Sequence, residues 1–201
     1  MKRDQTRYRA VAKLHADNID QGFLTTLGIP FLALLYEAID SCESGVLFTE
    51  ERGGQVVGFV AGADGMGRIY RSLLRRWWRV AVSLLPALFS PTKVRKIAEI
   101  LLHGQKSISG NQMPRAELLS IAIEPACRGQ GIAQKLYLQL LNHFKSQGIT
   151  EFRIVVGDQL AAAHKFYAGM GAERMSVLEV HAGQKSVLYA QRCDRETQNV
   201  R

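Results

Sequence analysis

One stretch constrains the fold more than any other, because it joins an apolar run, a turn with two glycines and a long amphipathic pattern over residues 116–148. The run AELLSIAIEP predicts a buried strand that ends at Pro125. The segment GIAQKLYLQLLNHFKSQG has apolar residues at four-residue spacing, which predicts a helix that ends near Gly148. A strand that leads through a tight turn into a helix indicates a mixed α/β protein.

The rest of the chain supplies further strands and helices around this unit. We expect a first strand over 6–15 and then a helix over 17–28, with Asp17 as its N-cap and Gly28 at its end. The remaining patterns predict a helix over 29–41, a hairpin over 45–63, a strand over 151–158, a helix over 159–172 and a hairpin over 174–192. This order predicts a mixed, mostly antiparallel sheet of about seven strands with helices on both faces, in one domain over residues 1–201.

Composition narrows the class of protein. Hydrophobic residues make up 47% of the 201-residue chain and charged residues 22%, which is typical of a globular domain. The three cysteines (Cys42, Cys127 and Cys193) form no C-x-x-C pair, which argues against a disulfide framework and a zinc site. We therefore expect no metal and a cytoplasmic protein, without a signal peptide or a membrane-spanning helix.

The net charge of +8 is concentrated in one segment. Seven basic and no acidic residues lie between Arg71 and Lys96, which leaves about +1 for the rest of the chain. Since the basicity is local and no nucleic-acid reading motif accompanies it, we expect no nucleic-acid partner.

The turn RGQGIA, from Arg128 to Ala133, predicts an anion site. The first N–H groups of a helix have no internal partners, glycines allow an anion to approach the backbone, and arginine adds charge. The Rossmann pattern fails because its third glycine is absent, and the Walker A pattern is absent altogether. A plain strand–turn–helix connection is the alternative interpretation.

Two segments resemble a known family. The stretch LLSIAIEPACRGQGIAQKLYLQLL resembles motif A of the GNAT acyltransferases, which bind acetyl-CoA, and VVGDQLAAAHKFYAGMGAE resembles that family's second segment. The resemblance covers residues 117–173. Asp158 stands where the family often has asparagine, and Gly171-Ala172 stands for a Gly-Phe pair.

The resemblance implies how the cosubstrate acetyl-CoA is held. Backbone N–H groups of the turn would bind its pyrophosphate, and the strand would pair edge-on with its pantetheine arm, with the N–H of Ile123 on the thioester carbonyl. The implied cofactor-binding residues are Ile121, Ala122, Ile123, Arg128, Gly129, Gln130, Gly131, Ile132, Ala133 and Asp158.

Two residues are candidates for catalysis. Tyr167 follows Phe166 where the family's tyrosine falls, and a phenol with a pKa of about 10 can donate a proton to a departing thiolate. Glu117 heads an apolar strand and is the candidate base for the acceptor amine, acting through water. The alternatives are a tyrosine that packs in the core and a solvated carboxylate at the strand end. The five histidines are interpreted as packing or surface residues.

The segment 65–110 predicts a helical insertion between the third and fourth strands of this count. Arginines flank Trp77 and Trp78, and a second helix is expected after SPT at 90–92. It is interpreted as a lid over the domain, with a peripheral membrane contact through residues 70–100 as the alternative. Because it enters at the amino end of the strand 117–124, away from the phosphate end, we expect it to shape the choice of acceptor.

The resulting hypothesis is an acetyltransferase that moves an acetyl group from acetyl-CoA to a small amine by direct attack in a ternary complex. The alternative is a non-catalytic acyl-CoA-binding module, docked on a membrane surface through the basic insertion.

Overall fold

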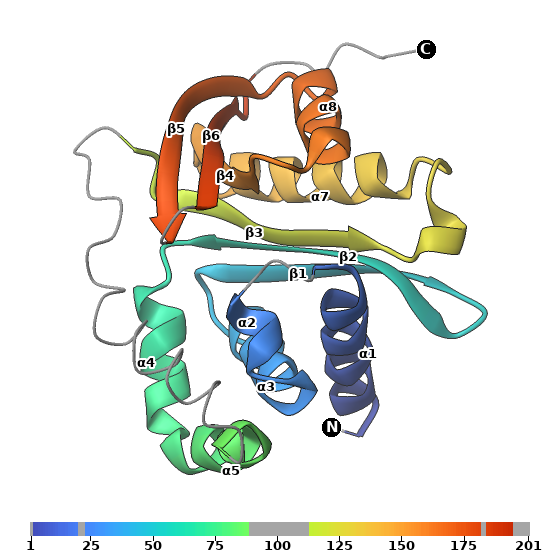
Figure 1. Cartoon of the computed structure of the whole chain (residues 1–201), viewed down its shortest axis with the longest axis vertical. Coiled ribbons are helices and arrows are strands. Elements are labelled where there is room, and N and C mark those ends of the chain that lie inside the picture. Colours follow the sequence, from blue (N-terminus) through green and yellow to red (C-terminus); the bar gives the residue numbers. More distant parts are fainter. Residues whose placement is uncertain (1, 20–22, 89–112, 182–183, 195–201) are drawn as a thin grey trace.

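The computed structural model describes residues 2–19, 23–88, 113–181 and 184–194. Within them, six strands form one sheet in the order β1-β2-β3-β4-β6-β5 (Figure 1). All neighbouring strands are antiparallel except β3 and β4, which are parallel. The strands are β1 Gly45–Arg52, β2 Gln55–Asp64, β3 Ala116–Ile123, β4 Glu151–Gly157, β5 Glu173–His181 and β6 Gln184–Arg192. The mixed, mostly antiparallel sheet is confirmed.

Helices cover both faces of this sheet. The buried side chains divide into two clusters, one on each face. We call the cluster that contains Tyr36, Phe59 and Ile69 the α3 core, and the cluster that contains Leu136, Phe144 and Phe152 the α7 core. The helices of the α3 side are α1 Lys2–Asn18, α2 Phe23–Thr26, α3 Ile29–Asp40, α4 Gly67–Arg75 and α5 Trp77–Leu88; those of the α7 side are α7 Ile132–Ser146 and α8 Ala161–Gly169.

The strand predicted over 6–15 is wrong, because these residues lie inside α1. Alternating apolar residues in this stretch predicted a strand, but burial follows the helical period. Tyr8, Val11 and His15 are three and four residues apart, and all three are buried against the α3 side. The loss of this strand reduces the sheet from about seven strands to six in the described part of the chain.

The helix α3 confirms the prediction over 29–41, but its start differs from the expected connection. Asp17 is not an N-cap; it lies in the last turn of α1 and forms an ion pair with Lys13. Gly28 has a φ of +89° and serves as the N-cap of α3. A glycine at this position is expected, since side chains other than glycine rarely adopt a positive φ.

The insertion begins with two helices, α4 and α5, which lie beyond α3 at one end of the sheet (Figure 1). Ile69 and Leu73 bury one side of α4 in the α3 core, and Arg76 separates the two helices. The second helix predicted after residues 90–92 falls outside the described residues. No helix in the described ranges is long and apolar enough to cross a membrane.

Candidate functional site

The sheet opens between its two parallel strands. β3 pairs with β4 over three residues only, Ala116–Leu118 against Phe152–Ile154. From Ser120 onward β3 pairs with β2 alone, while β4 continues to pair with β6 up to Gly157. Because both strands run in the same direction, the opening widens toward their carboxyl ends, where the glycine turn begins (Figure 1).

A β-bulge in β3 accompanies this opening. The register with β2 shifts between Ala61, which faces Ser120, and Gly62, which faces Leu118, so Leu119 has no partner in β2. Leu119 packs against the α3 core, and Ser120 bonds on the same side to the Tyr36 hydroxyl at 2.8 Å. A bulge bends its strand and increases its twist. The bend starts where β3 and β4 separate, which explains the short parallel pairing.

The hydrogen-bond alternation shows which backbone groups face the opening. The N–H of Glu124 donates to Val57 O of β2 at 2.8 Å. In an antiparallel ladder every second residue bonds to the same neighbour, so Ala122 faces β2 while Ile121 and Ile123 face away from it. In agreement, the Ile123 carbonyl accepts a bond from Arg128 Nε at 3.2 Å. Of the three predicted strand residues, two thus offer backbone groups toward β4.

The glycine turn presents a group of unbonded donors. Gly129 and Gly131 have φ angles of +74° and +75°, and Gly131 is the N-cap of α7. The first backbone bond of that helix is donated by Lys135 to Gly131 O at 2.9 Å. Among the described residues, none of the N–H groups from Gly129 to Gln134 donates a backbone hydrogen bond. Such a cluster at the positive end of a 15-residue helix suits an anion.

Side chains around the turn hold it in place. Arg128 Nη2 donates to Asn18 Oδ1 of α1 at 2.7 Å, in addition to its bond to the strand. Gln130 is bonded to Arg52, which lies at the end of β1. Arg128 therefore braces the turn against α1, where the sequence predicted an additional charge for the anion. Arg52 was missed, because only the folded hairpin brings residue 52 to the turn.

Tyr167 lies in α8 and is buried, with 5% of its surface exposed. Its ring is 6.0 Å from the ring of Tyr137 and 6.3 Å from that of Tyr189, measured between centroids. Burial raises the pKa of the Tyr167 hydroxyl above its ordinary value of 10. The phenol therefore stays protonated at neutral pH and is available as a proton donor.

His164 fastens α8 to the end of β4. Its Nε2 lies 3.1 Å from Gly157 O and 3.2 Å from Asp158 O, and its Nδ1 lies 2.8 Å from the Tyr189 hydroxyl. Since carbonyl oxygens only accept, Nε2 carries a hydrogen and donates to them. From the sequence alone, His164 is interpreted as a packing or surface residue. In the structure, its hydrogen bonds set the position of α8, the helix that carries Tyr167.

Asp158 lies directly after β4, at the same end of the parallel strands as the glycine turn. Its N–H donates to Lys185 O at 3.0 Å, and its side chain is exposed. The N-cap of α8 is Leu160, two residues farther on, so the Asp158 side chain is not the cap of this helix.

Glu117 lies in the paired part of β3, on the face that bears α3 and α4. It accepts two bonds from its strand neighbour Arg153, at 2.9 and 2.7 Å, and both side chains are partly buried. The pKa of Tyr70 in α4 is raised, first by partial burial and then by the negative charge of Glu117. The charge of this carboxylate therefore acts on a side chain of the insertion, which the linear sequence did not reveal.

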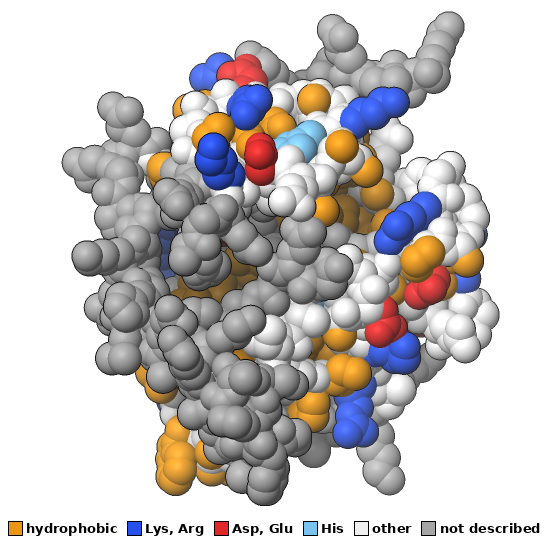
Figure 2. All heavy atoms as spheres, viewed as in Figure 1, with side chains coloured by type: hydrophobic (Ala, Val, Ile, Leu, Met, Phe, Trp, Pro, Cys, Tyr) orange, Lys and Arg blue, Asp and Glu red, His pale blue; other side chains and the backbone are white. Residues whose placement is uncertain are grey.

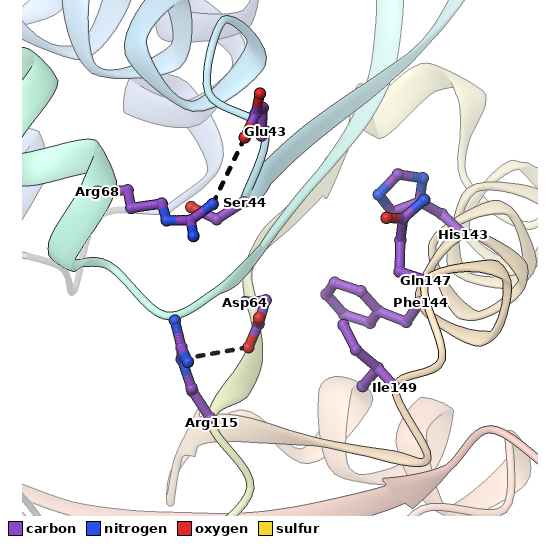
Figure 3. A pocket seen from close by; sticks show the side chains of 9 residues that line it. All are labelled: Glu43, Ser44, Asp64, Arg68, Arg115, His143, Phe144, Gln147 and Ile149. Atoms are coloured by element: carbon purple, nitrogen blue, oxygen red, sulfur yellow. Dashed lines mark ion pairs between the residues drawn. The ribbon is translucent and has the colours of Figure 1, made fainter.

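A separate cavity of about 300 Å³ lies at the amino end of β3 (Figure 3). Arg115 pairs with Asp64 there at 3.4 Å, and Arg68 pairs with Glu43 at 3.5 Å. His143 and its neighbours on α7 form the opposite wall. None of the candidate residues lines this cavity. In the described ranges, no three His, Cys, Asp or Glu side chains gather as a metal site.

The comparison with known proteins identifies the family. Residues 16–172 match the acetyltransferase (GNAT) family. The chain belongs to the GNAT acetyltransferase family. The matched span runs from the end of α1 to the residue before β5, so it contains the opening, the glycine turn and α8.

Individual GNAT relatives are distant. A 65-residue stretch is 29% identical to the [ribosomal protein bS18]-alanine N-acetyltransferase of Haemophilus ducreyi; it is 32% of this chain and 45% of that relative. An N-acetyltransferase structure from Staphylococcus aureus aligns over 94% of both chains with a TM-score of 0.61 and 14% identity. A Bacillus anthracis protein solved with acetyl coenzyme A aligns over 78% of this chain and 67% of its own, with a TM-score of 0.50 and 12% identity. The solved structures support the GNAT fold.

Proposed function

We propose that this GNAT protein transfers the acetyl group of acetyl-CoA to an amine by direct attack in a ternary complex. One observation carries the proposal. The free edge of β3 ends at Ile123, and the short 3-10 turn Pro125–Cys127 connects it to the unbonded N–H groups of the glycine turn. An extended ligand with amides at one end and phosphates at the other matches both parts.

The donor site consists of backbone groups. The N–H groups from Gly129 to Gln134 bind the pyrophosphate, and the N–H of Ile123 pairs with a pantetheine amide, as an added strand would. Gly129 and Gly131 leave room, since a side chain built at either would meet no atom within 4 Å. Arg128 and Asn18 keep the turn in its conformation.

The reacting end of the donor lies at the narrow end of the opening. Acetyl-CoA supplies a thioester, whose carbonyl is activated by a hydrogen-bond donor. Ile123 adjoins the turn that binds the phosphates, whereas Ile121 lies deeper and next to the bulge. We therefore assign the activating N–H to Ile121 in preference to Ile123, because the arm separates the thioester from the pyrophosphate.

Tyr167 and Glu117 carry out the two proton transfers, to the leaving thiolate and from the attacking amine. Tyr167 is protonated at neutral pH, as a phenol ordinarily is, and it donates to the leaving sulfur. Glu117 lies four residues from Ile121, about 13 Å along an extended strand, so it accepts the amine proton through water. Arg153 holds the carboxylate of Glu117 in a fixed orientation.

The acceptor is the open part of this proposal. The curated relative is named for an alanine of a ribosomal protein, so a peptide that begins with alanine heads the panel of amines to be tested. Amino sugars, polyamines and small amines complete the panel. A non-catalytic acyl-CoA-binding protein is the second candidate, since the donor site would serve binding equally well.

Release of free thiol from acetyl-CoA, measured against this panel, tests the proposal. We expect acceptor-dependent release that Tyr167→Phe suppresses. Calorimetric binding of acetyl-CoA without thiol release for any amine would favour the binding protein. No binding of acetyl-CoA would exclude both functions.

A further inference from the structure

The outward side of α4 and α5 is apolar and exposed. A stripe of large apolar side chains there is 59–69% exposed. We call it the aromatic face; it consists of Leu74 on α4 and of Trp77, Trp78 and Val82 on α5. Some hydrophobic side chains are visible at the lower left of Figure 2, where these helices lie. An exposed apolar stripe on a folded protein indicates a surface that binds a membrane, another protein or a ligand.

A groove lined by arginines lies beside this face. Arg68, Arg71 and Arg75 are three and four residues apart on α4 and border a cavity of about 400 Å³. Its remaining walls are Ser41, Cys42, Glu43 and Ser72. Arg68 has a loose ion pair with Glu43 at 3.5 Å. In the part of the chain that the structure describes, Arg71 and Arg75 form no ion pair, so the groove retains positive charge.

The inward side fixes both helices to the domain. Arg76 and Arg79 donate three hydrogen bonds to Glu37 of α3, at 2.6, 2.9 and 2.9 Å. Ile69 and Leu73 are buried in the α3 core. The sequence predicted a lid that packs on the domain, and this explains the inward side of the two helices but not their outward side. The aromatic face and the arginine groove remain on the other side, in fixed positions.

We propose that this outward side docks on an anionic lipid bilayer. Tryptophan favours the interface between headgroups and acyl chains, and leucine and valine add buried apolar area. Arginines in a row beside such a face bind lipid phosphates. Tryptophan and arginine are also enriched in protein interfaces. The bilayer is favoured because the arginines in a row give this surface one sign of charge, which matches anionic headgroups. No acidic residue lies between 65 and 88 to repel the membrane.

Docking here leaves the donor site free. The insertion and the glycine turn lie at opposite ends of β3 (Figure 1), roughly 25 Å apart for an eight-residue strand. Acetyl-CoA can then enter from solution while the protein is bound to lipid. The proposal does not depend on acetyl transfer, since docking needs neither donor nor acceptor.

The protein carries its own reporter for the test, because Trp77 and Trp78 are the two tryptophans of the chain. Tryptophan emission of the full chain is recorded with phosphatidylcholine vesicles that contain or lack phosphatidylglycerol. We expect a saturable blue shift with the anionic vesicles, weakened by added salt. The variant Arg71→Glu with Arg75→Glu should bind them about 30-fold more weakly or worse.

The control reverses two exposed arginines on other elements, Arg9→Glu with Arg174→Glu, which changes the net charge equally. It should bind within about twofold of the wild type, since the docking surface is intact. Thermal unfolding verifies that each variant is folded.

Four results would overturn the proposal. An unchanged emission with anionic vesicles would exclude docking, and equal binding to neutral vesicles would exclude charge recognition. A shift that grows with protein concentration without lipid would indicate a second copy on this face. A shift caused by inorganic phosphate alone would indicate a soluble anion in the groove.

Discussion

The two ends of β3 differ in the atoms that form their surfaces. At the carboxyl end, the glycine turn offers backbone N–H groups, and its side chains mainly brace the loop. At the amino end, Glu117, Arg153 and the helices of the insertion offer side chains. A backbone site depends on conformation and tolerates many sequences, whereas a side-chain site depends on identity. We infer that the carboxyl end fixes the donor and the amino end the acceptor.

Tyr167 on α8 gives the largest expected effect. Tyr167→Phe removes the proton donor and keeps the ring, so kcat should fall about 100-fold while acetyl-CoA affinity changes less than about twofold. Steady-state thiol release and calorimetry measure the two quantities. Tyr137→Phe is the control, because Tyr137 is also buried and its hydroxyl donates to Gln191 at 2.9 Å. An equal loss of kcat in both variants would mean that packing alone is responsible.

The donor end is tested by strain in the backbone. Gly131→Val forces a branched residue to a φ of +75°, which shifts the turn and should weaken acetyl-CoA binding by at least about tenfold. Gly148→Val imposes the same strain at a φ of +74°, beyond the far end of α7. Both variants should lose similar stability in thermal unfolding, but only the first should lose donor affinity in calorimetry. Equal affinities would show that the donor binds elsewhere.

The amino end is tested at Glu117. Glu117→Gln keeps a hydrogen-bond acceptor for Arg153 and removes the base, so kcat should fall about tenfold at pH 7 with little change in donor affinity. Residual activity should recover as the pH rises, since more of the acceptor amine is then deprotonated. A pH profile of kcat that stays parallel to the wild type would remove Glu117 from proton transfer.

The contact of Glu37 with the arginines of the insertion gives the smallest expected effect, which is on stability. Hydrogen bonds from Arg79 hold the pKa of Glu37 below its ordinary value, so this contact stabilises the fold above that value and is lost as the pH falls through the lowered pKa. Glu37→Gln should cost about 1 kcal/mol at pH 7, because both partners remain partly exposed to solvent. Denaturant unfolding should show this difference shrinking below about pH 4. A constant difference at all pH values would contradict the assigned charge interaction.

The parts predicted from sequence are those set by local patterns. The strand, turn and helix over residues 116–148 follow from consecutive residues, and α3 and the hairpin β1–β2 do so as well. The prediction of a strand over 6–15 was wrong because the apolar residues in this stretch fit the two-residue period of a strand as well as the period of a helix. The burial of Val11 and His15 against the α3 side decides for the helix. The single-domain organisation and the roles of the candidate residues stay predictions.

The features that the sequence could not reveal are those set by pairing between distant segments. The bulge at Leu119 depends on the register with β2, and the opening depends on how few residues β3 shares with β4. Arg52 reaches the turn only after the hairpin folds, and Glu37 meets the insertion only after α3 packs beside it. The composition of the insertion predicted its basic and aromatic character, but not its division into an inward and an outward side.

The short pairing of β3 with β4 has a mechanical consequence. The sheet consists of two leaves, β1-β2-β3 and β4-β6-β5, hinged on three residue pairs. A donor that forms hydrogen bonds along the free edge of β3 would lie between the two leaves and reduce their relative motion. Amide hydrogen exchange should then slow on both leaves when acetyl-CoA binds, including in β6, which the donor does not contact. The enzyme would be most deformable before its first substrate arrives and would present a fixed frame to the second.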